Sequence, residues 1–298
     1  MAREAKKNAN YGKGAHQIDS LSGDLWLNPD WVAGKIWATL QAPGYKPPVL
    51  PAVALELVQL TANAEVPLAK IRGVIQSEPM LAAQLLGSAQ SAYYARGNPI
   101  TSLDDAIARL GYRVIGDLFL QAALTTRVFR APGYEVPMQR LRVHSVVCAN
   151  VARLICRRTG FPDDYAFMCG LLHDVGMAAA IAVLADAPRG ASSPSYDVVK
   201  DAVERIHESA TTILGRFWSL PEDVQLVLAH HHHFEISGKV HPLAAAICLA
   251  DAIAAQVGAG AGNEVDVDGA SRAAAFLGLS AADVEGLALA GENFIGLA

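Results

Sequence analysis

The sequence predicts an all-α fold, and three observations lead to that expectation. Alanine and leucine dominate the composition and β-branched runs are few, which favours helix over strand. From Ala52 onward, apolar residues recur at the three- and four-residue spacing of a helix that buries one face. No strict two-residue alternation persists, so we expect no sheet. At 298 residues and 52% hydrophobic content, the chain is long enough for one large domain or two modest ones.

The charge balance argues against a nucleic-acid partner. The formal net charge is −5, and the basic residues cluster only near the N-terminus, at Arg3, Lys6, Lys7 and Lys13. Proteins that bind nucleic acid usually present a basic face. We interpret the cluster as part of a solvated tail and expect no nucleic-acid partner.

The cysteines and the apolar runs favour a cytoplasmic protein. None of the four cysteines belongs to a C-x-x-C pair, so we expect buried, reduced thiols at Cys148, Cys156, Cys169 and Cys248. Residues 1–20 lack the apolar segment of a secretory signal. The longest apolar runs, such as Met177–Ala185, are shorter than the roughly 20 residues of a membrane span. We therefore expect no membrane association.

The N-terminal region is predicted to hold one short helix. Residues 1–25 are polar and aperiodic. Asn28-Pro29 is a helix-start signal within Trp26–Leu40, and we expect the tryptophans Trp26, Trp31 and Trp37 to pack on the main body. The proline- and glycine-rich stretch Pro43–Pro51 predicts an extended connector.

Periodicity predicts a series of helices along the rest of the chain. In the first half we expect helices from Ala52, from Leu68, after Glu78-Pro79, over Ala106–Leu110 and over residues 112–127. A capping box at Thr101–Asp104 precedes the fourth of these helices, and Gly111 is expected to end it. Arg130–Pro137 marks a candidate domain boundary. Beyond it we expect helices over Met138–Thr159, Asp163–Leu172, Val175–Leu184, Ser195–Trp218, Pro221–His231 and Pro242–Val257, and two short ones after Gly269. Ala187–Ser195 reads as a loop and Ala259–Asn263 as a hinge.

One apolar segment contains an adjacent histidine and aspartate. His173-Asp174 follows two leucines and precedes Val175-Gly176. A carboxylate in such surroundings requires a partner, because burying a lone charge is very costly. A metal ion is one such partner, and both side chains reach it if the pair sits at a helix end, where the chain can turn them the same way.

Whether a metal ion is bound also has to be asked of other histidines and of Asp251, in the same half of the chain as His173-Asp174. Taken alone, His144 is more typical of a core histidine, His207 of a surface residue, and Asp251 of a capping or ion-paired aspartate. Successive helical residues point about 100° apart, so at most two neighbours of the run His230–His233 reach one site. Taken together, these residues lie on predicted helices of one bundle, where facing helices can build a metal site. Imidazoles and carboxylates suit Mn, Fe, Zn or Mg, and Asp174 could bridge two ions.

The order of these residues resembles the HDOD (HD-related output domain) family of the HD superfamily, from about Leu50 to Ala255. The marks in the first half are Leu50-Pro51, Val74-Ile75, Glu78-Pro79, Leu85-Leu86, Gln90-Ser91-Ala92, Ile100-Thr101-Ser102, Ala106-Ile107 and Leu110-Gly111. The family usually has Asp-Pro and Asn-Ser where this chain has Glu78-Pro79 and Gln90-Ser91. The marks in the second half are His144-Ser145, Gly170–Gly176, His207, Trp218–Pro221, His231-His232 and Asp251.

The resemblance implies an all-helical fold of two subdomains and a bacterial signalling role. The expected organisation is a tail and short helix over residues 1–42, an N-terminal helical subdomain over 43–130, an HD-like helical bundle over 131–258 and a C-terminal extension over 259–298. It implies a site for one or two divalent metal ions, held by His144, His173, Asp174, His207, His231, His232 and Asp251. It also implies a signalling protein as partner. HDOD proteins are generally regarded as regulatory modules without demonstrated phosphodiesterase activity.

Departures from the related HD-GYP phosphodiesterases weaken an enzymatic interpretation. Their His-Asp pair is usually followed by a lysine after the glycine, where this chain has Met177, and their Gly-Tyr-Pro segment is absent after the paired histidines. Three hypotheses follow: a regulatory interaction module with a metal site, a metal-dependent phosphohydrolase acting on a cyclic dinucleotide or nucleotide with Asp174 essential, and a scaffold without metal. We favour the first and keep a nucleotide or phosphate ligand open.

Overall fold

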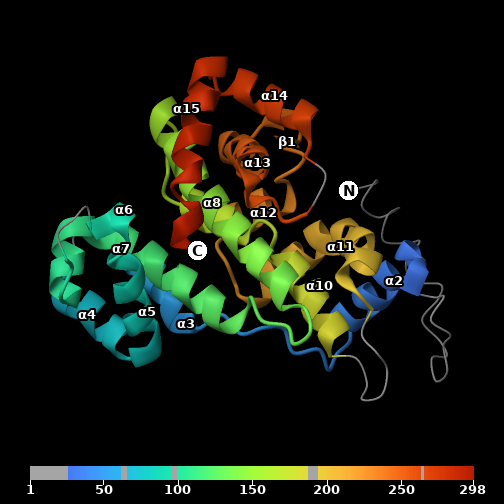
Figure 1. Ribbon diagram of the computed structural model, residues 1–298, viewed down its shortest axis with the longest axis horizontal. Helices are drawn as coiled ribbons and strands as arrows, with labels where there is room; N and C mark the ends of the chain where they lie inside the picture. Colours follow the sequence, from blue (N-terminus) through green and yellow to red (C-terminus); the bar gives the residue numbers. More distant parts are fainter. Residues whose placement is uncertain (1–25, 62–65, 96–98, 187–193, 263–264) are drawn as a thin grey trace.

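The computed structural model describes residues 26–61, 66–95, 99–186, 194–262 and 265–298, and its fold is helical as expected (Figure 1). The predicted N-terminal tail, with its basic cluster, lies outside these residues. Most of the predicted loop at 187–195 and the last residue of the predicted hinge at 259–263 lie outside them as well.

The predicted N-terminal helix is confirmed as α2 (Pro29–Leu40). The Asn28 side chain accepts hydrogen bonds from the backbone N–H groups of Asp30 and Trp31, which satisfies donors that have no partner inside the helix. Helix α2 packs on α11 and α10, which lie far along the sequence (Figure 1). Trp26, Trp31 and Trp37 pack partly buried against the hydrophobic core, as predicted.

The helices between residues 52 and 127 form a lobe around α7. They are α3 (Ala52–Thr61), α4 (Leu68–Gln76), α5 (Pro79–Ala89), α6 (Ala92–Ala95) and α7 (Leu103–Arg127). Helices α3 and α5 pack on α7, and the Ser102 side chain caps its first turn. Gly111 separates the two predicted helices, as expected. It adopts a non-helical conformation with a φ of 78°, which glycine tolerates, and kinks α7 at that point.

The second half is built around α8 (Glu135–Thr159), on which α9 and α13 pack. The other helices are α9 (Ala166–Leu172), α10 (Val175–Ala185), α11 (Tyr196–Phe217), α12 (Glu222–Ala229) and α13 (Pro242–Ala254). Helix α8 starts before the predicted Met138, because Pro137 falls in its first turn, where a missing N–H costs no helical bond. Helix α12 ends before the predicted His231, so His231 and His232 lie beyond it.

The expectation of no sheet is wrong. β1 (Glu235–Ile236) and β2 (Lys239–Val240) form an antiparallel hairpin that pairs Glu235 with Val240. Ser237 and Gly238 turn the chain with φ values of 52° and 77°, which suits a two-residue hairpin turn. Strands of two residues are too short to produce a visible alternation, which is why the sequence pattern missed them.

The C-terminal elements cover α8 and α13. A π-helical turn η2 (Ala255–Ala259) replaces the end of the predicted helix over Pro242–Val257. The two predicted short helices are confirmed as α14 (Val267–Phe276) and α15 (Ala281–Glu292), followed by a 3₁₀ turn η3 (Ile295–Leu297). Helix α14 packs on α13 and α15 packs on α8, so the chain ends next to α8 (Figure 1).

Among the described residues, two helical stretches are long and apolar enough to cross a membrane, which the count of uninterrupted apolar runs had missed. They are Ala166–Ala185 and Pro242–Ala259, and the first is 89% buried inside the protein. This stretch comprises α9, the His173-Asp174 turn and α10, all within the hydrophobic core. The burial of Ala166–Ala185 inside the protein accounts for the apolar composition of this stretch. The four cysteines are also buried and free, as predicted.

Two glycines allow the helices around His173-Asp174 to pack without side chains between them. A Cβ atom on Gly170 would lie 2.6 Å from the Ala149 Cα atom of α8. A Cβ atom on Gly176 would lie 2.1 Å from the His207 carbonyl oxygen and 2.5 Å from the Thr211 backbone nitrogen of α11. These obstacles are backbone atoms, which cannot move without displacing a helix. The glycines therefore set the distances of α9 from α8 and of α10 from α11.

We predict that Gly176→Ala lowers the free energy of unfolding by about 1–3 kcal/mol or more, because α10 and α11 must separate. Gly87 of α5 is a matched control, since it is helical and a Cβ atom there meets nothing within 4 Å. Gly87→Ala should leave stability unchanged or raise it by up to about 1 kcal/mol. Denaturant unfolding of both variants measures the difference. Equal stabilities would contradict the close packing of α10 on α11.

Candidate metal centre

The His173-Asp174 pair lies at a helix break, as the sequence interpretation required. Helix α9 ends at Leu172 and α10 begins at Val175, and the pair forms the turn between them. Asp174 occupies the N-cap position of α10, but its side chain makes no capping hydrogen bond. Both side chains are buried and are directed toward the same cluster of histidines.

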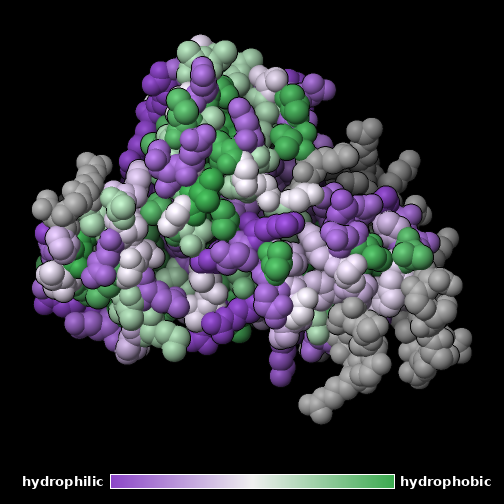
Figure 2. All heavy atoms as spheres, in the orientation of Figure 1, coloured by the Kyte–Doolittle hydropathy of each residue, from purple (hydrophilic) through white to green (hydrophobic). Residues whose placement is uncertain are grey.

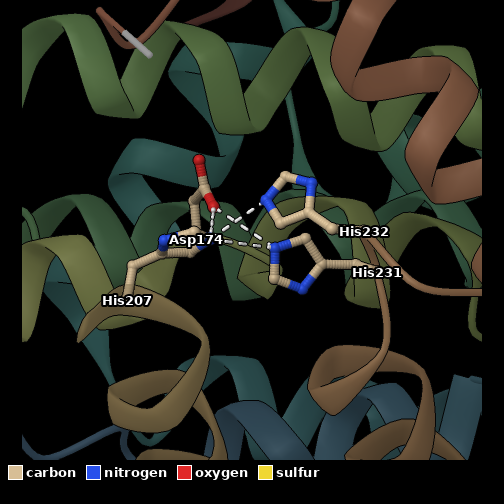
Figure 3. Close-up of side chains that lie close together, drawn as sticks. All are labelled: Asp174, His207, His231 and His232. Carbon is tan, nitrogen blue, oxygen red and sulfur yellow. Dashed lines mark hydrogen bonds and ion pairs between the residues drawn. The ribbon is translucent and has the colours of Figure 1, made fainter. Parts of the chain in front are cut away.

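The structure brings together all seven predicted site residues. His144 comes from α8, His207 from α11 and Asp251 from α13, and His231 and His232 follow α12. They form two groups whose donor atoms lie within 4.8 Å of one another: His144, His173 and Asp251 in one, and Asp174, His207, His231 and His232 in the other. Figure 3 shows the second group converging on the Asp174 carboxylate. His230, His233 and His241 belong to neither group, and the His241 side chain caps α13.

Asp174 connects the two groups through its two oxygens. Its Oδ2 lies 3.7 Å from His144 Nε2 and 3.5 Å from His173 Nε2. Its Oδ1 lies 3.5 Å from His207 Nε2 and 3.6 Å from His231 Nε2. One carboxylate therefore faces a different set of imidazole nitrogens with each oxygen, as a bridging ligand would.

Asp251 and His232 form the more exposed edge of the cluster. Asp251 Oδ1 lies 3.2 Å from His144 Nε2, and its Oδ2 lies 4.0 Å from His232 Nδ1. Both side chains are 21% exposed, whereas those of the other five residues are 9% exposed or less. Solvent thus reaches the cluster on the side of Asp251 and His232.

Backbone carbonyls fix the protonation of four of the histidines. The Nδ1 atoms of His144, His173, His207 and His231 lie 3.0, 2.8, 2.5 and 2.7 Å from the carbonyl oxygens of Ala259, Gly170, Glu204 and Leu228. A carbonyl oxygen only accepts, so each Nδ1 carries the proton and donates it. In the neutral ring, each Nε2 then presents a lone pair to the centre of the cluster.

The facing Nε2 atoms provide the test of whether metal ions fit. His144 Nε2 lies 3.1 Å from His173 Nε2, and His207 Nε2 lies 3.2 Å from His231 Nε2 and 3.1 Å from His232 Nε2. Lone pairs at these distances repel one another unless a proton or a cation lies between them. Neutral imidazoles oriented by a second hydrogen bond, together with carboxylates, are a typical donor set for divalent transition metals. The residues therefore fit such ions.

The electrostatics keep several donors in the protonation state that binds metal. Burial lowers the pKa of His173 to about 4, and burial with the neighbouring His231 and His207 lowers that of His232 to about 3. Burial alone would raise the pKa of Asp174, but the surrounding histidines hold it well below its ordinary value. In the same way, the hydrogen bond and charge of His144 outweigh burial and lower the pKa of Asp251 to about 2. Near neutral pH, these imidazoles are neutral and these carboxylates are charged.

The supporting residues were not predicted. The Thr211 hydroxyl accepts from the Gly176 N–H at 2.9 Å and donates to the His173 carbonyl at 3.1 Å, which ties the His173-Asp174 turn to α11. The Ala259 carbonyl that orients His144 belongs to the π-helical turn. Backbone acceptors leave no trace in residue identity, and a buried threonine is common in helices. Only Gly176 gave a signal, as part of the His-Asp motif.

Comparison with known proteins places these features in a family context. The sequence profile described as the HDOD domain matches residues 48–234. This range contains all the predicted site residues except Asp251, and it ends before the Ala255 limit expected from the sequence marks. No curated protein matches the chain.

Several solved structures share the fold. An HDOD domain protein of unknown function from Geobacter sulfurreducens has a TM-score of 0.64 at 20% identity, over 88% of this chain and 97% of that one. A proposed metal-dependent phosphohydrolase from Shewanella amazonensis SB2B has a TM-score of 0.69 at 16% identity, over 90% of this chain and 97% of that one. A proposed signal transduction protein from Marinobacter aquaeolei VT8 has a TM-score of 0.62 at 20% identity, over 99% of this chain and 64% of that one. At these identities the similarity establishes the helical fold alone.

We predict opposite pH trends for the metal-free and metal-loaded protein. Burial lowers the pKa values of His144 and His231, but Asp251 raises the first and Asp174 the second, so both lie above 6.5 without metal. Such a group stabilises the fold fully below its unfolded pKa, and the contribution is lost as pH rises through the folded pKa. A metal ion requires neutral imidazoles, so its contribution grows over the same interval.

Thermal unfolding of metal-loaded and chelator-treated protein between about pH 6 and 8 checks this prediction. The difference in Tm between the two forms should increase with pH. Asp174→Asn, which removes the bridging charge, should show little metal-dependent difference at any pH. A difference that is constant or decreases with pH would contradict competition between protons and metal at these histidines.

Proposed function

This chain belongs to the HDOD family, and we propose that it is a bacterial regulatory protein whose helical core binds two divalent metal ions. One ion would be held by His144, His173 and Asp251, the other by His207, His231 and His232, with Asp174 bridging both. The observation that carries this proposal is the orientation of Asp174, whose two oxygens face separate groups of imidazole nitrogens. Five imidazoles favour Fe, Mn or Zn over Mg, which prefers oxygen donors.

The donor count supports a regulatory rather than a catalytic role. With Asp174 shared, each group supplies four protein donors, enough to complete the tetrahedral shell of a structural ion. Five of the seven side chains are almost fully buried. Met177, in the position where HD-GYP enzymes have a lysine, is buried in the core and supplies no charge to the cluster. The role we propose for the ions is to hold five chain segments together in a cytoplasmic signalling module, whose partner is another signalling protein.

A phosphohydrolase is the second candidate, and one observation favours it. The exposed edge at Asp251 and His232 leaves the cluster accessible from solvent. Ions that take more than four ligands would supply Lewis-acid activation of a phosphate ester and of water there. The carboxylates and imidazoles would position those ions, and Asp174 would be indispensable because both groups depend on it.

Metal analysis of protein purified without a chelating column tests the site. We predict about two ions per chain in the unaltered protein, about one in Asp251→Ala, and less than one in Asp174→Ala, because removal of the bridge affects both groups. His230→Ala is the matched control, since His230 neighbours the ligands but belongs to neither group, and its metal content should be unchanged. Full metal content in Asp174→Ala on a folded protein would disprove the bridging role.

Turnover assays separate the two candidate functions. The metal-loaded protein would be offered cyclic dinucleotides, nucleotides and generic phosphate esters with Mn or Fe. For a regulatory module we expect no hydrolysis that depends on Asp174. Hydrolysis that disappears in Asp174→Ala but persists in His230→Ala would show that the protein is a phosphohydrolase.

A further inference from the structure

A second polar cavity lies apart from the metal centre, where the lobe around α7 meets α8. Its volume is about 440 Å³, and its lining includes Tyr93 and Tyr94 of α6, Arg109 of α7, Arg153 and Arg157 of α8, and Phe294 near the C-terminus. None of the seven metal-site residues lines it. Figure 2 shows that hydrophilic and hydrophobic side chains are mixed over this face of the molecule.

Arg153 is the innermost charged group of this cavity. It is 6% exposed, its guanidinium lies 4.5 Å from the centre of the Phe167 ring, and it forms an ion pair with Asp117. Its Nε atom is buried and has no hydrogen-bond partner among the described residues. A buried N–H without an acceptor is costly. This atom is covered, so a ligand oxygen would reach Arg153 only at the part of its side chain that lines the cavity. The contact with the Phe167 ring and the ion pair hold the guanidinium in place for such a ligand.

Two further arginines line the cavity closer to solvent. The Arg109 side chain is 39% exposed and pairs with Asp105, and that of Arg157 is 54% exposed and pairs with Asp163. Exposed ion pairs of this kind contribute little stability, so either guanidinium can turn to an incoming anion at small cost. Among the residues that the structure describes, no acidic side chain lines the cavity. Three arginines thus line one cavity, and their guanidinium groups suit phosphate oxygens.

Aromatic rings form part of the remaining lining, beside aliphatic residues and Asn150. The Tyr93 ring lies 5.2 Å from the Phe294 ring and 4.9 Å from the Tyr94 ring, with both neighbours near perpendicular to it. Tyrosine and phenylalanine rings offer a surface on which a planar base can stack, and stacking tolerates different bases. The cavity volume lies within the range of small-molecule sites. The combination distinguishes this cavity from a simple anion site, because inorganic phosphate would not use the rings.

We propose that this cavity binds a mononucleotide, with its phosphate on Arg153, Arg109 and Arg157 and its base against the tyrosines of α6. The site combines helices from both sides of the predicted boundary near residue 131. A bound nucleotide would therefore connect the lobe around α7 to α8, the helix that carries His144. The proposal does not rest on the metal centre, and either can fail without the other.

Calorimetric titration of the full chain with GMP, AMP and inorganic phosphate tests the proposal. The titrations are made with metal-loaded and with chelator-treated protein, because a nucleotide phosphate could otherwise bind at the metal centre. We expect Arg157→Gln and Arg109→Gln each to weaken nucleotide binding about tenfold or more. Arg158→Gln is the matched control, since Arg158 neighbours Arg157 but pairs with Asp283 of α15 outside this cavity, and its affinity should be unchanged. Tyr93→Leu should weaken nucleotide binding but not phosphate binding.

Four results would overturn the proposal in folded variants. Absence of nucleotide binding up to about 1 mM would exclude a useful site. Equal affinity for nucleotide and inorganic phosphate would exclude a role for the aromatic rings. Equal weakening by Arg158→Gln and Arg157→Gln would indicate general surface attraction. Loss of binding on chelation, or in Asp174→Ala, would place the nucleotide at the metal centre instead. Binding that survives metal removal and depends on Arg157 supports the proposal.

Discussion

The burial of the Asp174 carboxylate is the constraint on which the rest of the structure depends. Its side chain is 1% exposed and is surrounded by imidazoles from α8, α11 and the segments after α9 and α12. Transfer of such a charge from water is very unfavourable unless opposite charge compensates it. Without metal, protons on His144 and His231 supply part of this compensation, because the neighbouring carboxylates raise the pKa values of both side chains. Divalent ions would satisfy the carboxylates and all of the imidazoles together.

The architecture around the carboxylate follows from the same requirement. Donors from five segments can converge only if the helices approach closely, which Gly170 and Gly176 permit. The break between α9 and α10 lets adjacent residues face one centre, and the π-helical turn after α13 places a carbonyl against His144. The highly apolar helices α9 and α10 provide a low-polarity surrounding that strengthens these interactions.

Much of this arrangement could be predicted from residue patterns, because the patterns report local structure and pairwise chemistry. Asn28-Pro29 and Ser102 start helices through side-chain caps that the sequence displays directly. Asp174 was identified because a charge in an apolar run requires a partner. Patterns failed where tertiary contacts decide. The hairpin at Glu235–Val240, for example, depends on only two residue pairs.

Residue patterns were also insufficient to choose the metal ligands among the four consecutive histidines His230–His233. Residue type alone could not separate His231 and His232 from His230 and His233, and the family resemblance decided between them. The structure gives the physical reason: α12 ends at Ala229, and the following turn directs only His231 and His232 toward Asp174. The carbonyls that set the histidine tautomers, and Thr211 beside them, were beyond sequence analysis because their roles depend on where the backbone lies.

We propose that two metal ions lie on either side of the Asp174 carboxylate. Anomalous X-ray diffraction from crystals of protein purified without chelators, measured at the absorption edges of Mn, Fe and Zn, would locate them. We expect two anomalous peaks about 3.5–4 Å apart, one beside each oxygen of Asp174. A map with no peak at Asp174, from crystals grown with those metals present, would contradict the proposal.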